Sequence, residues 1–164
     1  MTAIPQARQL REMVRAKLLE SLKIVEFVKS REESVQIHRF SDIGEQDPPL
    51  IIISTPEEVS KDLGDDPPSQ RTLIHLMVDV VCPLQKADQI DAITYEVRRI
   101  LSSMVFGKGS FEPIRHRKTI TASYPAGHKL FASSAAEYVT SFDIEYDQSG
   151  KYEPMEGVKV NGLL

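Results

Sequence analysis

The sequence predicts an α+β domain, a mostly antiparallel sheet with two helices packed on one face. Three stretches of the 164-residue chain carry this prediction. Residues 72–81 have apolar side chains at nearly every second position, as in a strand with one buried face. Residues 87–104 repeat apolar side chains at steps of three and four, as in a one-sided helix. Residues 136–147 alternate apolar with polar or acidic side chains, and a slip of one residue would bury the acids.

The remaining elements follow from shorter patterns. An apolar stripe that includes Leu10, Val14 and Leu18 predicts an amphipathic helix near the N-terminus. A run of β-branched residues that begins at Leu50 predicts a strand covered on both faces. Together these signals predict a helix over residues 5–22 and strands over 24–28, 35–40, 50–55 and 114–124.

Residues 56–70 are predicted to form a long loop. Pro56 is expected to end the preceding strand, and Pro67 and Pro68 stand together towards the end of the segment. The segment has five acidic residues against one lysine, so its net charge of −4 equals that of the whole chain. A connection of this length is typical of a functional or mobile segment, and a partner that orders it would fit both descriptions.

Length and periodicity predict a single domain over residues 1–147 and a flexible or partner-docking tail over residues 148–164. A net charge of −4 and a pI near 5.6 argue against specific nucleic-acid binding and against an anionic membrane surface. The longest apolar run, residues 50–53, is far too short to span a membrane. The single cysteine allows no internal disulfide. We therefore expect a soluble protein made in a reducing cytoplasm.

The sequence has no motif of an enzyme that we could identify. It lacks a glycine-rich phosphate loop, a GxSxG turn and an HExxH helix. His75 and Asp79 share a strand face but stand roughly 13 Å apart, too far to bind one metal ion. Cys82 is interpreted as a small buried apolar group. We expect no catalytic residue, no metal and no cofactor.

Two segments of opposite charge are the candidate interfaces. One is the acidic segment 56–70, and the other is the basic segment 108–118, which has four basic residues and one acid. In a head-to-tail ring, each subunit offers one surface to the other surface of its neighbour. The predicted interface residues are Glu57, Glu58, Asp62, Asp65, Asp66, Arg71, Arg115, Arg117 and Lys118.

The order of elements resembles the tail-terminator proteins of long-tailed bacteriophages, similar to minor tail protein U. The residues that carry the resemblance are hydrophobic patterns rather than invariant chemistry, and they cover most of residues 6–147. They are the helix at 10–18, the strand and turn at 49–58, the strand that ends at 81, the helix at 87–101 and the closing strand at 138–146.

The resemblance implies a structural virion protein of the tail–neck junction with no enzymatic activity. Such a protein assembles into a homo-hexameric ring in the host cytoplasm, caps the tail tube protein to end its polymerisation, and joins the tail to the head–tail connector or head-closure protein. DNA passes through such a ring without specific recognition. The resemblance also implies that the loop after the third strand is mobile in the free subunit and orders in the ring.

Two other interpretations remain open from the sequence. The chain could be a different neck component, such as a tail-completion or head-closure protein, which also builds rings from small α+β subunits. It could instead be a small intracellular enzyme or ligand-binding domain that uses the sheet face opposite the helices. The second alternative predicts a concave pocket with converging polar groups and a shifted pKa.

Overall fold

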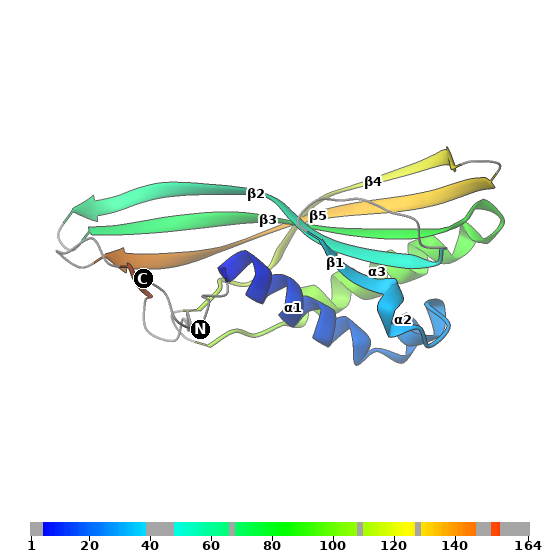
Figure 1. Cartoon of the computed structure of the whole chain (residues 1–164), viewed down its shortest axis with the longest axis horizontal. Helices are drawn as coiled ribbons and strands as arrows, with labels where there is room; N and C mark the ends of the chain where they lie inside the picture. The colour runs from blue at the N-terminus through cyan, green and yellow to red at the C-terminus, as the bar shows by residue number, and fades with distance from the viewer. Residues whose placement is uncertain are drawn as a thin grey trace.

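The computed structural model describes residues 5–38, 48–65, 68–107, 110–126, 129–146 and 152–154. It confirms an α+β fold, with one mostly antiparallel sheet and the helices on one side of it (Figure 1). Short 3-10 turns lie at Glu32–Ser34 and Leu84–Lys86. The main elements are α1 (Gln6–Leu19), α2 (Leu22–Phe27), β1 (Val35–His38), β2 (Leu50–Asp65), β3 (Pro68–Pro83), α3 (Asp88–Ser103), β4 (Arg115–Ala126), β5 (Lys129–Tyr146) and β6 (Tyr152–Pro154).

The sheet order is β1-β2-β3-β5-β4, and β6 pairs with the end of β5. β2 and β3, β3 and β5, and β5 and β4 are antiparallel pairs, whereas β1 runs parallel to β2. β3 and β5 form the centre of the sheet, paired continuously from Ser69 with Glu145 to Pro83 with Phe131. Both central strands were predicted, and their predicted faces are confirmed.

The hydrophobic core lies between the sheet and the helices. Alternate residues of β3 from Thr72 to Val80 are buried, as the period-2 pattern predicts. On β5 the buried face includes Tyr138 and Phe142, which are 0% and 4% exposed. The helices contribute the apolar stripes that the sequence predicts, namely Leu10, Val14 and Leu18 of α1 and Ile90, Ile93, Val97, Ile100 and Leu101 of α3.

The prediction of an extended segment at 24–28 is wrong, because this stretch belongs to a third helix, α2. The β-branched Ile24 and Val25 favour a strand locally. However, the Ser21 side chain accepts a hydrogen bond from the Ile24 amide and caps a helix. Ile24 is completely buried, so tertiary packing overrides the local preference.

The predicted loop at 56–70 is also wrong. β2 continues to Asp65 and β3 begins at Pro68, so these residues form a long antiparallel hairpin. Pro56 does not end β2 because it lies in a β-bulge between Ser54 and Glu57, where the ladder is already interrupted. All residues from 56 to 65 are exposed, so the alternation that marks a half-buried strand is missing.

The start of β2 matches its prediction. Leu50, Ile51, Ile52 and Ile53 are all 0% exposed, in agreement with a strand covered on both faces. Short β1 lies beside them in parallel, pairing Val35 with Ile51. Arg15 of α1 donates hydrogen bonds to the Val35 and Glu32 carbonyl oxygens at 2.6 and 2.9 Å, which ties the first helix to this edge.

Two β-bulges divide the sheet into two wings. β2 bulges between Ser54 and Glu57, and β4 bulges between His116 and Lys118. Both bulges lie at the level of residues 75–77 on β3, and bulges increase the local twist of a sheet. In Figure 1 the β2–β3 hairpin extends to the left beyond the helices, while the β4–β5 hairpin extends to the right.

Part of the predicted C-terminal tail is ordered against the sheet. Tyr152–Pro154 form β6 and pair with Ile144–Tyr146 at the end of β5. The rest of residues 148–164 lies outside the described part of the chain. The domain boundary at residue 147 therefore stays a prediction.

Candidate functional site

The two outer strands of the sheet have open edges. β1 pairs only with Ile51–Ser54, and no other described strand pairs with the outer edge of β2 from Glu57 to Asp65. We call residues 56–65 the β2 arm. On the opposite side of the sheet, the structure describes no strand beyond β4, whose outer edge is open from Arg115 to Ala126. Open edges are templates for pairing with another chain.

The two open edges start from the same row of the sheet. This row runs across four strands, pairing Glu57 with His75, His75 with Val139, and Val139 with Arg115. From it the β2 arm extends in one direction along the strands, and β4 extends in the other. The open edges are therefore at diagonally opposite corners of the sheet. In Figure 1 the β2 arm lies at the left end of the sheet and β4 at the right end.

The two open edges have opposite charge. The β2 arm has four acidic residues and Lys61, a net charge of −3. β4 has Arg115, Arg117 and Lys118 and no acidic residue, a net charge of +3. The sequence prediction of two oppositely charged segments thus becomes two oppositely charged strand edges.

Two of the predicted interface residues, Glu57 and Lys118, lie on the sheet face opposite the helices, in ion pairs within the chain. His75 Nδ1 lies 2.9 Å from Glu137 Oε1, and its Nε2 lies 4.0 Å from Glu57 Oε2. Lys118 Nζ lies 3.5 Å from Glu137 Oε2. The hydrogen bond from His75, opposed by burial and helped by Lys118, holds the pKa of Glu137 below its usual value.

Arg71 is the most firmly paired of the predicted residues. Its Nε and Nη2 atoms donate hydrogen bonds of 2.7 and 2.9 Å to the two carboxylate oxygens of Asp143. These bonds raise the pKa of the Arg71 guanidinium. Arg71 therefore joins β3 to β5 within one subunit, and its positive charge is already compensated.

The other predicted residues divide between the two wings. Glu58 and Asp62 lie on the opposite face of the β2 arm from Glu57, since they pair with Ile74 and Gln70, and Asp62 accepts a 2.8 Å hydrogen bond from Gln70. Asp65 is the last residue of β2, while Asp66 lies outside the described residues. Arg115 and Arg117 are exposed on β4, and Arg117 is the residue inserted by the bulge.

A hollow of about 370 Å³ opens beside the start of β4. Arg115 lines it together with Arg71, and Glu112 contributes the one acidic side chain. The hollow lies where the chain enters β4, since the Glu112 amide donates a 2.8 Å hydrogen bond to the Ser141 carbonyl oxygen of β5. Its remaining lining residues are Leu73, Pro113, Val139, Thr140 and Ser141.

The sequence prediction missed the apolar side chains of the open strands. Val59 and Leu63 of the β2 arm are 48% and 46% exposed, and Ile120 of β4 is 57% exposed. Leu130, which follows the β4–β5 turn, is 54% exposed. The signal was present in the sequence as β-branched and leucine residues among charged ones, but without the fold there was no way to know that neither face of these strands is covered.

In the part of the chain that the structure describes, the buried polar groups do not form a catalytic arrangement. Cys82 is buried as predicted; burial raises the pKa of its thiol, and Sγ donates to the Lys86 carbonyl oxygen at 3.4 Å. A protonated, buried thiol is a poor nucleophile. Among the residues that the structure describes, no group of three or more His, Cys, Asp or Glu side chains could hold a metal ion.

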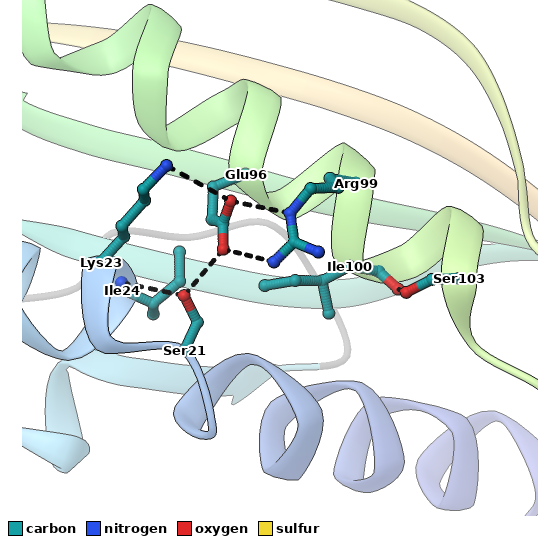
Figure 2. Close-up of polar contacts among 7 residues, drawn as sticks. All are labelled: Ser21, Lys23, Ile24, Glu96, Arg99, Ile100 and Ser103. Carbon is teal, nitrogen blue, oxygen red and sulfur yellow. Dashed lines mark hydrogen bonds and ion pairs between the residues drawn. The ribbon is translucent and has the colours of Figure 1, made fainter.

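Glu96 of α3 is a buried carboxylate with a structural role (Figure 2). It accepts hydrogen bonds of 3.0 and 2.7 Å from Arg99 and one of 2.9 Å from the Ser21 hydroxyl. Lys23 Nζ lies 4.0 Å away. The Arg99 hydrogen bonds lower the pKa of Glu96 to about 2, against the opposing effect of burial. Both carboxylate oxygens of Glu96 accept hydrogen bonds, and the one from Ser21 joins α2 to α3. Because its pKa is about 2, Glu96 is ionised near neutral pH and has no proton to donate.

No family model matches the chain, and no curated protein matches it. A solved structure does share its fold, a chain of the "Virion of native gene transfer agent (GTA) particle". The two chains superpose with a TM-score of 0.55 at 11% sequence identity, over 82% of this chain and 94% of the other. At this identity the match establishes the fold. In the described part of the chain, no helix is long and apolar enough to cross a membrane.

Proposed function

We propose that this chain is a structural protein of a phage particle, a tail terminator whose subunits form a closed ring through the two open edges of the sheet. The observation that carries the proposal is the pair of oppositely charged open edges at opposite corners of one sheet. The ring caps the tail tube, ends its polymerisation and joins the tail to the head connector. The shared fold with a chain of a gene transfer agent virion and the sequence resemblance to tail terminators support this role.

The charges favour head-to-tail contacts over a two-fold dimer. In a two-fold contact each edge meets its own copy, so the β2 arm would face acids with acids and β4 would face bases with bases. Like charges directly opposite each other on paired strands are destabilising. A head-to-tail contact instead places the edge of charge −3 against the edge of charge +3. When the rotation between neighbours closes, such contacts produce a ring.

The strand directions also suit a head-to-tail contact. β2 and β4 are separated by three antiparallel steps, so they run in opposite directions within one subunit. A neighbour that continues the sheet in the same orientation brings its β2 against β4 as an antiparallel pair. Antiparallel ladders are the commoner and slightly more stable arrangement.

The exposed apolar side chains give the contact a hydrophobic component. Val59, Leu63 and Ile120 lie on the two open strands and are about half exposed in the single chain. Burying most of such a side chain contributes roughly 1 kcal/mol or more. Assembly therefore removes both the unpaired backbone edges and the apolar surface that flanks them.

The placement at the tail–neck junction, with the tail tube protein on one face and the connector or head-closure protein on the other, rests on the sequence resemblance. The subunits would assemble in the host cytoplasm and remain in the virion. A closed ring has a central channel through which DNA can pass without a specific nucleic-acid binding site. The net negative charge of the chain agrees with this absence of specific binding.

The test combines oligomer mass with tube binding. Light scattering of the purified chain across concentration should show a closed oligomer, and negative-stain images should show rings that attach to the ends of tail tubes. A chain that stays monomeric at the highest concentration, with and without tubes, contradicts the ring. Rings that bind capsid connectors but not tube ends would instead identify another neck component.

A further inference from the structure

We propose that the segment that follows β6, residues 155–158, binds in the hollow beside Arg115, on the sheet face opposite the helices. In this arrangement the Glu156 carboxylate pairs with Arg115, and Val158 covers the apolar floor of the hollow. Residues 155–164 lie outside the described part of the chain. The direction of β6 and the residues that line the hollow support this assignment. The contact lies within one chain and does not rest on the proposed ring.

β6 directs the chain towards the hollow. Its residues Tyr152–Pro154 pair antiparallel with Ile144–Tyr146 at the end of β5. β3 occupies the other edge of β5, so β6 lies on the same edge as β4. The chain that leaves Pro154 therefore runs back along β5 towards Val139, which is the register partner of Arg115.

The chain cannot follow this edge all the way to β4. Glu112 already occupies the edge, because its amide donates a 2.8 Å hydrogen bond to the Ser141 carbonyl oxygen of β5. About two residues after Pro154 fit before this point, and the chain must then leave the plane of the sheet. Gly157 stands at this place in the sequence, and glycine tolerates the backbone angles of a sharp turn.

The hollow opens on the sheet face opposite the helices. Its lining residues Arg115 and Val139 stand in the row of His75, and Leu73 is two residues from His75 along β3. Side chains two residues apart on a strand, and partners in one row, share a face. The volume of the hollow, about 370 Å³, is within the range of roughly 300–1,000 Å³ that is typical of ligand pockets.

The helix side of the same strand is already filled. Phe142 of β5 is 4% exposed and packs edge-on against Phe111, with ring centroids 5.7 Å apart. Phe106 extends this aromatic cluster, and its ring centroid lies 5.5 Å from that of Phe111. A chain that leaves the edge of β5 here therefore turns onto the face opposite the helices, where the hollow lies.

Arg115 provides an uncompensated positive charge for the segment. Among the described residues it forms no ion pair and no side-chain hydrogen bond, either with Glu112 of the lining or with any other acid. Arg71, the other cation of the lining, is held by Asp143. Glu156 is the first acidic residue after β6, so it is the residue that would complete the charge of the hollow.

Glu156 lies within reach of Arg115. Pro154 pairs with Ile144 and Arg115 with Val139, so the two stand five residues apart along β5, roughly 17 Å. Two extended residues cover roughly 7 Å, which leaves roughly 10 Å between the Cα atoms of Glu156 and Arg115. The long side chains of an arginine and a glutamate bridge such a gap.

Val158 gives the contact an apolar component. Leu73 and Val139 form the apolar floor of the hollow, and Val158 follows Glu156 by two residues. β6 holds the start of the segment against the sheet, so binding is intramolecular and has an effective concentration in the millimolar range or above. One charge pair and one apolar contact are therefore enough to keep the segment in place.

Thiol labelling tests whether the segment covers the hollow. Ser141→Cys places a reporter in the lining, and Ser133→Cys places a matched reporter on the same face of β5, eight residues away. Both serines are partly exposed, and the natural Cys82 is buried and gives little background. Each variant is made in the full chain and in a chain that ends at Pro154, and its rate of reaction with the neutral reagent N-ethylmaleimide is measured.

Removal of the segment should expose the reporter in the hollow. If the segment is bound about 90% of the time, ending the chain at Pro154 should speed labelling at position 141 about tenfold. The rate at position 133 should not change. Equal rates at position 141 in the two chains, with circular dichroism showing both to be folded, would overturn the proposal.

A charge exchange tests the pairing of Glu156 with Arg115. In the full chain with the reporter at position 141, Glu156→Lys and Arg115→Glu should each remove most of the rate difference between the full and shortened chains. The two changes together should restore it. Lys159→Glu alters a charge of the same segment that is assigned no partner, and it should have little effect. If no single change reduces the difference, the pairing is wrong.

The outcome is separate from that of the proposed ring. Labelling is measured where light scattering shows single chains, and a rate difference that does not depend on protein concentration places the contact within one chain. A difference that appears only as the concentration rises would overturn the proposal, because the segment would then bind a neighbour. Failure of this test leaves the ring untouched, and a chain that forms no ring can still pass it.

Discussion

Arg71 on β3 forms a bidentate ion pair with Asp143 on β5. Its Nε and Nη2 atoms donate hydrogen bonds of 2.7 and 2.9 Å to the two carboxylate oxygens. The residues are register partners in the centre of the sheet. The pair therefore joins two strands of one subunit, although the sequence placed Arg71 among the candidate interface residues.

Replacing Arg71 with alanine should lower the free energy of unfolding by about 0.5–1 kcal/mol, because half of the Arg71 side chain is exposed and water screens the pair. The ring should be unaffected. Urea unfolding of Arg71→Ala, Asp143→Asn and the double variant gives the coupling energy of the pair. A loss of assembly without loss of stability would show that Arg71 contacts a neighbour after all.

Glu96 should make stability depend on acid pH. Its pKa is lowered from the usual 4.5 to about 2 in the folded chain. A carboxylate with a lowered folded-state pKa contributes stability that is present in full above its unfolded pKa and is lost as the pH falls towards the folded value. The contribution should therefore disappear between about pH 4.5 and pH 2.

The variant Glu96→Gln should be less stable than wild type by about 1–2 kcal/mol at pH 7, since it keeps the shape but loses the charge-assisted hydrogen bonds from Arg99 and Ser21. Thermal unfolding of both proteins from pH 7 to pH 2.5 should show the difference shrinking in acid. A difference that is constant over this range would mean that the charge of Glu96 does not stabilise the link between α2 and α3.

The carboxylate of Glu137 should titrate at a higher pH when His75 is removed. The His75 hydrogen bond is the largest single contribution that lowers the Glu137 pKa, and it ranks ahead of the Coulombic attraction of Lys118. NMR titration of side-chain carboxylates in the monomer should therefore show a larger upward shift in His75→Ala than in Lys118→Ala. The reverse order would mean that the hydrogen bond across β3 and β5 is not the dominant interaction.

Tyr138 should tolerate loss of its hydroxyl group but not of its ring. The ring is completely buried and packs edge-on against His116, with ring centroids 5.4 Å apart. The hydroxyl oxygen is buried and has no hydrogen-bond partner among the described residues, and burial raises the pKa of Tyr138 to about 12. Removing an unsatisfied buried polar group is neutral or favourable.

We therefore expect Tyr138→Phe to be as stable as wild type or more stable by up to about 1 kcal/mol. Tyr138→Leu should lose about 2–3 kcal/mol through the cavity that it leaves. Denaturant unfolding of both variants measures the two effects. A clearly destabilised Tyr138→Phe would indicate that the hydroxyl group has a hydrogen-bond partner, such as an ordered water molecule.

The sequence was sufficient for the elements that have one face in the core. The alternation of apolar residues around Tyr138 and the helical apolar stripe around Val97 both follow from burial of one face of the element. The buried faces of β5 and α3 are as predicted. It failed at α2 and at the β2 arm for opposite reasons. Ile24 is buried by tertiary packing that its neighbours do not reveal, and the β2 arm from Pro56 onwards is exposed on both faces, so it has no alternation.

The candidate site was predicted in part. Charge alone was enough to single out the acidic and basic segments, but their geometry depends on the sheet. Only the strand order shows that Glu57 and Arg115 stand in one row at opposite edges, and that Arg71 is satisfied by Asp143 within the subunit. The apolar residues Val59 and Ile120 could not be recognised as surface residues until both faces of their strands were known.

The two bulges have a consequence for the size of the assembly. One extra residue near Pro56 on β2 and one at Arg117 on β4 lie at the same level, and they set how strongly one wing is rotated relative to the other. If the wings make the contacts between subunits, this rotation determines the angle through which each subunit turns its neighbour. The circumference of the ring would then be encoded by two inserted residues, and deleting either one would change the number of subunits that close it.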